Sequence, residues 1–385
     1  MSDLLAKPWG ENMVRSFCVG CALLVSGCGS KTLSLDADGV VTPSADPSVV
    51  GSVHEDIGQL AVDDTRLYWL AVDRENGVAN TNCTLRACDK LNCAASLRTI
   101  APRKSFGALG FGVVGNEIYS FQALDGDFGA SPSAALVATD LGTGVARTLA
   151  TDVFHMNQFV YRGTAAYDTD AVYFSIPDPA SAQNEIESIS APSGDSRNVV
   201  VMLGSEQIIT IATHDDYLYW LQSPMQGLAS LRRIIKKGTG TLELLADGLE
   251  VTKLPDQFGP FSALAFDEND VYWAENTLSG SIDRCPLSGC SGAPEVLAAP
   301  VRAPTAIAID SVQAHYLYEL DAFSYAIAEC DAGGCEPSVP SITGVDGANL
   351  LALDGDALYT ATTSRNLNPN AHQASPMAEI RRFAK

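Results

Sequence analysis

Six cysteines in three identically spaced pairs are the residues of this chain best suited to chemistry. Each pair has the form Cys-x4-Cys, and the pairs are Cys88 with Cys93, Cys285 with Cys290, and Cys330 with Cys335. Such thiols form disulfides, or bind zinc where four of them converge. The last two pairs fall in different units of the repeat described below, too far apart to share an ion. We therefore expect three disulfides, each closing a four-residue hairpin loop, with Cys83 in a neighbouring loop and outside these bonds.

Acidic residues could bind a divalent cation, and two short segments suggest this. Asp36-x-Asp38-Gly39 and Asp125-Gly126-Asp127 are similar to calcium loops but lack the downstream glutamate. Most other aspartates stand in turn sequences such as DDT, DTD and DEND, where a carboxylate accepts backbone N–H groups. We expect these aspartates to form turns. Calcium is the one cofactor that the sequence leaves open, and no metal ligands are assigned.

Motifs of the common enzyme classes are absent from the sequence. Gly110, Gly112 and Gly115 fit the GxGxxG pattern, but residues 116–121 read as a strand, whereas a dinucleotide site needs a helix there. No GxSxG, HExxH or P-loop pattern occurs, and the five histidines are scattered. The sequence leaves enzymatic activity open and favours its absence.

One sequence repeat occurs seven times along the chain, and its folded units must position all of these residues. Each copy has an apolar run, a polar turn and a strand with tyrosine: 59–70, 108–121, 163–175, 210–221, 262–274, 306–320 and 350–361. From tyrosine to tyrosine (68, 119, 173, 219, 272, 318, 359) the steps are 51, 54, 46, 53, 46 and 41 residues. A period of this size predicts an array of units that bury their apolar faces against one another.

One unit, residues 261–297, shows what each copy contains. SALAF, VYWAE, SIDRC and CSGAPEVLA read as four short strands separated by turns. Small residues dominate the first strand, as expected beside a narrow central channel, and aromatic residues in the second would fill the space between units. Four antiparallel strands per unit predict the blade of a β-propeller.

The two ends of the chain predict how the ring closes. Residues 378–385 match the third strand of a unit, and residues 47–53 supply the missing fourth. The expected fold class is all-β: a seven-bladed β-propeller of four-stranded antiparallel blades, spanning residues 47–385 and closed by an N-terminal strand. Closure would remove two exposed sheet edges.

The first 28 residues predict export. Arg15 precedes an uncharged, mostly apolar run of about a dozen residues, which is too short to span a bilayer. The run ends in Leu24-Val-Ser-Gly-Cys28, which resembles the lipobox of bacterial lipoproteins. The resemblance implies that residues 1–28 are a lipoprotein signal segment with its lipobox, and that cleavage before Cys28 leaves this cysteine as the lipidated N-terminus. Gly29 after it implies the outer membrane, facing the periplasm or the cell surface. Translation could start at Met1 or Met13.

Residues 29–46 read as a flexible tether, because they are polar and rich in Gly, Ser, Asp and Pro. The net charge of −22 would repel nucleic acids and anionic lipid head groups. The expected protein is a monomer that meets the membrane only through its lipid anchor.

A recognition site would lie at one mouth of the channel, on the loops that join the second to the third strand and one blade to the next. The candidates are the polar residues of these loops: His155, Asn157, Arg162, Glu206, Gln207, Asp256, Arg302, Asp346 and Asn349.

The LYW and VYW strands and the lipobox together resemble bacterial extracytoplasmic propeller lipoproteins with TolB-like or YWTD-like repeats, although Leu or Ala follows Tyr-Trp here. The resemblance implies a lipid-anchored scaffold that binds a protein or glycan at the channel mouth. The alternative is a metal-dependent hydrolase or lyase of the lactonase or streptogramin-lyase type, with Glu206, Asn349, His155 and Asp346 as candidate site residues.

Overall fold

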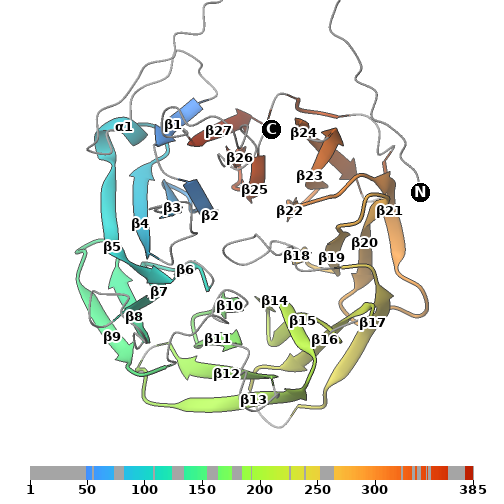
Figure 1. Cartoon of the computed structure of the whole chain (residues 1–385), viewed down its shortest axis with the longest axis horizontal. Helices are drawn as coiled ribbons and strands as arrows, with labels where there is room; N and C mark the ends of the chain where they lie inside the picture. Colours follow the sequence, from blue (N-terminus) through green and yellow to red (C-terminus); the bar gives the residue numbers. More distant parts are fainter. Residues whose placement is uncertain are drawn as a thin grey trace, which may run out of the picture. The chain divides into compact units, whose positions relative to one another are not determined.

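A computed structural model of the chain shows a seven-bladed β-propeller (Figure 1). It describes residues 49–53, 56–72, 82–106, 109–123, 134–153, 164–175, 184–191, 193–224, 227–237, 240–251, 264–321, 324–331, 334–335, 340–343, 345, 348–362 and 378–384. Among these residues no helix is long and apolar enough to cross a membrane. The signal segment, the tether and both calcium-like segments lie outside the described ranges.

The blades follow one another around the ring, each running from an innermost to an outermost strand (Figure 1). Blade 1 is β2 (Asp56–Val62), β3 (Arg66–Val72), β4 (Asn82–Asp89) and β5 (Arg98–Phe106), with the short helix α1 (Cys93–Ser96) before β5. Blade 2 is β6 (Phe111–Val114), β7 (Glu117–Ala123), β8 (Ala134–Asp140) and β9 (Ala146–Ala150). Blade 3 is β10 (Thr164–Tyr167), β11 (Ala171–Ser175), β12 (Asn184–Ser190) and β13 (Arg197–Gly204).

The remaining blades have the same antiparallel order. Blade 4 is β14 (Gln207–His214), β15 (Tyr217–Ser223), β16 (Ala229–Ile235) and β17 (Glu243–Leu249). Blade 5 is β18 (Leu264–Phe266), β19 (Asp270–Glu275), β20 (Gly280–Pro286) and β21 (Glu295–Val301). Blade 6 is β22 (Ala306–Ile309), β23 (Gln313–Asp321) and β24 (Ser324–Asp331), with an outer bridge from Ile327 to Ile342. Blade 7 is β25 (Ala348–Leu353), β26 (Ala357–Thr362) and β27 (Ala378–Ala384), with β1 (Val49–Val53) outermost.

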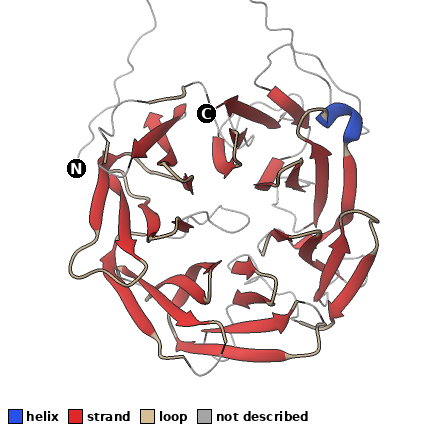
Figure 2. Cartoon of the chain, turned by 180° about the vertical axis from the view of Figure 1, so that it is seen from behind, coloured by secondary structure: helices blue, strands red, loops and turns tan. Residues whose placement is uncertain are grey.

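The two ends of the chain meet in blade 7, as predicted. β1 pairs antiparallel with β27, and Val53 lies opposite Ala378. The first strand of the described chain therefore completes the last blade, and the ring is closed by backbone hydrogen bonds. Figure 2 shows the same closed ring from behind, built almost entirely of strands.

The repeated aromatic residue always faces a small residue on the innermost strand. The pairs are Ala61–Tyr68, Gly112–Tyr119, Ala166–Tyr173, Ala212–Tyr219, Ala265–Tyr272, Ala308–His315 and Ala352–Tyr359. Gly112 shows why size is restricted there, because a Cβ at this position would lie 2.2 Å from Cγ of Tyr167 on the next blade. In the GxGxxG segment, Gly112 lies in β6 and Gly115 in the turn after it, and a strand, β7, follows as expected.

This register corrects one repeat. In blade 6 the equivalent of the tyrosines is His315, whereas the sequence pattern had indicated Tyr318. A run of aromatic residues in β23 masks the register, because Tyr316 and Tyr318 follow directly after the true position. With His315 the last two steps of the repeat become 43 and 44 residues in place of 46 and 41.

The apolar core is divided among the blade boundaries. Seven buried clusters exist in the described structure, and each joins residues of two neighbouring blades. Between blades 4 and 5, for example, fully buried Trp273 packs with Tyr219 and Leu221. The largest side chains therefore hold one blade against the next, as the prediction for the second strands stated.

The aspartates of the polar turns order the backbone. In blade 1, Oδ1 of Asp63 accepts hydrogen bonds from the N–H groups of Thr65 and Arg66, both at 2.7 Å. Its Oδ2 accepts the hydroxyl of Tyr68 at 2.6 Å. Asp267, Asp310 and Asp354 accept the equivalent backbone bonds in blades 5, 6 and 7. The turn role expected from the sequence is confirmed for these residues.

All three predicted disulfides are present, linking Cys88 to Cys93, Cys285 to Cys290, and Cys330 to Cys335. Each ties the end of a third strand to the turn after it. Cys83, in contrast, lies within β4 and is buried, so its placement in a loop was wrong. No cluster of three His, Cys, Asp or Glu side chains arranged for a metal occurs in the described ranges.

We expect the double substitution of Cys88 and Cys93 by serine to lower the free energy of unfolding by about 2 kcal/mol, the chain-entropy value for so small a loop. Urea denaturation under oxidising conditions would measure the loss. When all disulfides are reduced, the variant and the wild type should have the same free energy of unfolding. A variant as stable as the oxidised wild type would contradict the prediction.

Candidate binding sites on two faces of the ring

The antiparallel blades give the ring two faces with different loops. One, which we call the turn face, carries the turns after the first and third strands, such as residues 63–65 and 236–237. The other, the connection face, carries the loops after the second strands and the links between blades, such as residues 205–206 and 302–305. The sequence placed the candidate site on the connection face.

Three of the nine predicted site residues have described side chains. Glu206 lies in the link between blades 3 and 4, Gln207 begins β14 directly after it, and Arg302 lies in the link between blades 5 and 6. Asn349 is described only as part of the backbone of β25. The remaining five lie outside the described ranges: His155, Asn157, Arg162, Asp256 and Asp346.

Glu206 is held in place by both neighbouring blades. Its carboxylate accepts a hydrogen bond from Nε2 of Gln222, and Oε1 of Gln222 in turn accepts the indole N–H of Trp220 at 2.6 Å. The side chain of Asn184 donates to the backbone carbonyl of Glu206 at 2.5 Å. Because Trp220 and Gln222 are buried, this network fixes the link from which Gln207 begins β14.

Arg302 belongs to a separate part of the connection face. Its Nε lies 3.4 Å from a carboxylate oxygen of Glu319, and its backbone carbonyl accepts the N–H of the same residue at 3.0 Å. This link is two blade boundaries away from Glu206. The described candidates thus share one face without forming one constellation.

The structure also contains a pair of acidic residues between blades 4 and 5 that the sequence pattern did not indicate as a site. Asp283 on β20 is 4% exposed, and its carboxylate accepts the hydroxyl of Ser281 at 2.6 Å. Burial raises the pKa of Asp283 to about 6, and the charge of Glu275 contributes. Burial also raises the pKa of Glu275, and the charge of Glu250 adds to this shift. The only sequence signal for this pair is the two-residue alternation of β20, which places an acid on the buried face of the strand.

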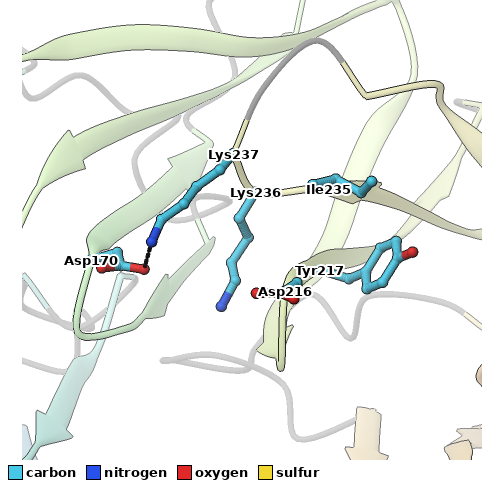
Figure 3. A pocket seen from close by; sticks show the side chains of 6 residues that line it. All are labelled: Asp170, Asp216, Tyr217, Ile235, Lys236 and Lys237. Carbon is cyan, nitrogen blue, oxygen red and sulfur yellow. Dashed lines mark ion pairs between the residues drawn. The ribbon is translucent and has the colours of Figure 1, made fainter.

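A cavity of about 290 Å³ opens on the turn face, between blades 3 and 4 (Figure 3). Its lining combines charged, aromatic and aliphatic side chains: Asp170, Asp216, Tyr217, Ile235, Lys236 and Lys237. Three turns, the start of β15 and the end of β16 bring these residues together. In the sequence these residues read as turn and strand residues, and no site was predicted from them.

Lys236 crosses the blade boundary beside this cavity. Its ammonium pairs with Oδ2 of Asp168 in blade 3, and the two side chains are 8% and 17% exposed. Burial alone would raise the pKa of Asp168, but the hydrogen bond and charge of Lys236 outweigh it, and the pKa lies below its usual value. Lys90 of blade 1 makes the equivalent pair with Asp354 of blade 7, at 2.5 Å.

No protein-family model matches the chain, and no curated protein matches it. Among solved structures, a prolyl endopeptidase matches with a TM-score of 0.53 and 11% identity over 86% of this chain and 50% of that chain. The β-propeller domain of the Trilobed protease from Pyrococcus furiosus, described as having an open velcro topology, matches at 0.52 with 9% identity over 81% and 91%. A GH74 enzyme of Niastella koreensis matches at 0.52 with 10% identity over 80% and 50%.

These likenesses show the fold alone, because all identities are far below 25%. The chain spans about half the length of the prolyl endopeptidase and of the GH74 enzyme. TolB from Acinetobacter baumannii is also matched, at a TM-score of 0.41 and 14% identity, which is too low to support an argument.

Proposed function

We propose that the chain is a lipid-anchored binding protein of the bacterial cell envelope, and that a protein or glycan partner docks on its connection face. The observation that carries the proposal is the fixed position of Glu206, which groups from blades 3 and 4 hold through Gln222 and Asn184. A polar link held in this way presents its exposed groups in a fixed geometry, which lowers the entropic cost of binding.

Arg302 supplies a second polar position on the same face. Its side chain is 48% exposed while Glu319 orients it, so its remaining N–H donors can meet acidic or hydroxyl groups of a partner. Docking at two separated positions favours a macromolecule or an extended glycan over a small molecule.

The test is affinity capture from envelope extract with the wild-type chain, followed by binding measurements with the partner identified. Arg302→Gln should weaken partner binding by about tenfold, as the loss of a charged hydrogen bond does. Asp356→Asn, an exposed change on the turn face, is the matched control and should leave affinity unchanged. If both variants bind the identified partner equally, the connection face is not the docking site.

Anchoring has its own test. We expect incorporation of labelled palmitate into the exported chain, with complete loss of label in Cys28→Ser. Label retained in that variant would contradict lipidation at Cys28.

The alternative function, a metal-dependent hydrolase or lyase, is distinguished by a calcium titration. If the protein is such an enzyme, calcium should raise its melting temperature, and Asn349→Ala should abolish that rise. The binding-protein proposal expects the same melting temperature with calcium and with a chelator.

A further inference from the structure

The cavity on the turn face differs from the equivalent place at other blade boundaries. Lys236 is the equivalent of Lys90, because each donates its backbone N–H to the turn of its own blade, at 2.8 and 3.0 Å. The next residue is Lys237 in blade 4 and Leu91 in blade 1. The structural lysine thus recurs, whereas the second lysine is particular to the cavity.

Lys237 is available to a ligand. Its side chain is 74% exposed and lies 2.7 Å from a carboxylate oxygen of Asp170, itself 48% exposed (Figure 3). Water screens an ion pair this exposed, and it contributes little to stability, so the ammonium can exchange Asp170 for another anion at little cost. Lys236 cannot do so, because it is nearly buried against Asp168.

Asp216 supplies the opposite charge. Its backbone carbonyl accepts the N–H of Lys236 at 2.8 Å, which fixes the turn. Within the described part of the chain its carboxylate has no hydrogen-bond or ion-pair partner. Counting Lys236, Lys237, Asp168, Asp170 and Asp216, the site has two positive and three negative groups. Among these described residues, Asp216 is the acid that makes no ion pair, and its charge acts on the nearby Lys237.

The rest of the lining is apolar and restricts size. Ile235 is 38% exposed, and the ring of Tyr217 is held by the guanidinium of Arg233, 4.3 Å from the ring centroid. A cavity of about 290 Å³ lies at the lower end of the range for ligand sites, so it admits only a small molecule.

We propose that this cavity binds a free α-amino acid with an aliphatic side chain. The α-ammonium group would pair with Asp216, the α-carboxylate with Lys237, and the side chain would lie against Ile235 and Tyr217. Neighbouring groups of opposite charge match a zwitterion, and neither a simple anion nor a simple cation would satisfy both. This site is separate from the docking face of the proposed function and goes beyond it.

The probe is L-leucine, titrated into the full chain at low ionic strength with calorimetry and ligand-observed NMR. We expect saturable binding that weakens as salt is added. N-acetyl-L-leucine lacks the ammonium and leucinamide lacks the carboxylate, so each should bind about tenfold more weakly or not at all.

Asp216→Asn and Lys237→Gln should each weaken leucine binding by a similar factor. Asp356→Asn, the equivalent turn position in blade 7, is the control and should bind as the wild type does. Melting temperatures establish that each variant is folded. The proposal is overturned if the wild type gives no saturable signal, if the blocked ligands bind equally well, or if both site variants retain full affinity. None of these outcomes bears on docking at Arg302.

Discussion

Replacement of Lys236 by methionine is expected to lower the free energy of unfolding by about 3–5 kcal/mol, the usual cost of removing one partner of a buried ion pair. The substitution leaves the aliphatic stem in place and deletes only the ammonium. Asp168 then stays buried with no cation beside it, at a boundary that the pair spans between blades 3 and 4. Urea denaturation followed by tryptophan fluorescence measures the loss.

The adjacent lysine provides the control for this experiment. Lys237→Met removes an equal charge from a side chain that is 74% exposed, and it should leave the free energy of unfolding nearly unchanged. The double variant Lys236→Met, Asp168→Asn should recover much of the loss, because no uncompensated charge remains. Equal effects of the two single lysine variants would show that the pair with Asp168 does not hold the boundary.

Asp283→Asn is expected to stabilise the protein at neutral pH, which is unusual for a buried substitution. The pKa of Asp283 rises from 3.8 to about 6 on folding, about two units, which corresponds to about 3 kcal/mol. The folded state therefore binds the proton more tightly than the unfolded state. This contribution to stability is complete below pH 3.8 and is lost as the pH rises through 6.

Measurement of the unfolding free energy between pH 3.5 and 8 tests this sign. The amide cannot ionise, so the variant should gain up to about 3 kcal/mol over the wild type at pH 7.5 and nothing near pH 3.5. Asp356→Asn, the same substitution on an exposed turn, is measured in parallel as the control. A variant that is less stable than the wild type across the whole pH range would contradict the conclusion that burial of the Asp283 carboxylate raises its pKa.

The architecture could be predicted because its signals are local. In most units, small residues on the innermost strand are followed by an aspartate turn and by a tyrosine five positions after the aspartate. The pairing of the strands gives each of these residues one fixed position in the blade. Blade 6 shows the limit of such signals. There His315 replaces the tyrosine, and only the pairing with Ala308 identifies the register.

The sites were harder to predict because they depend on contacts between units. Lys90 and Lys236 hold the same position, yet loops of unequal length before them hide the equivalence in the sequence. Asp283 occupies an ordinary strand position opposite Trp273, and its raised pKa arises from burial and from the charge of Glu275. A lysine directly after a third strand, facing an aspartate turn of the preceding unit, is the signal that a repeat-based search could use.

The pairing of β1 with β27 also determines when the ring can close during synthesis of the chain. Residues 49 and 381 are partners, so the contact that completes the ring joins the most distant parts of the described sequence. Blades 2 to 5 can each form from a continuous segment, but blade 7 needs both β1 and β27. Until β27 has been synthesised, β1 and β26 therefore keep unpaired strand edges, and the ring stays open.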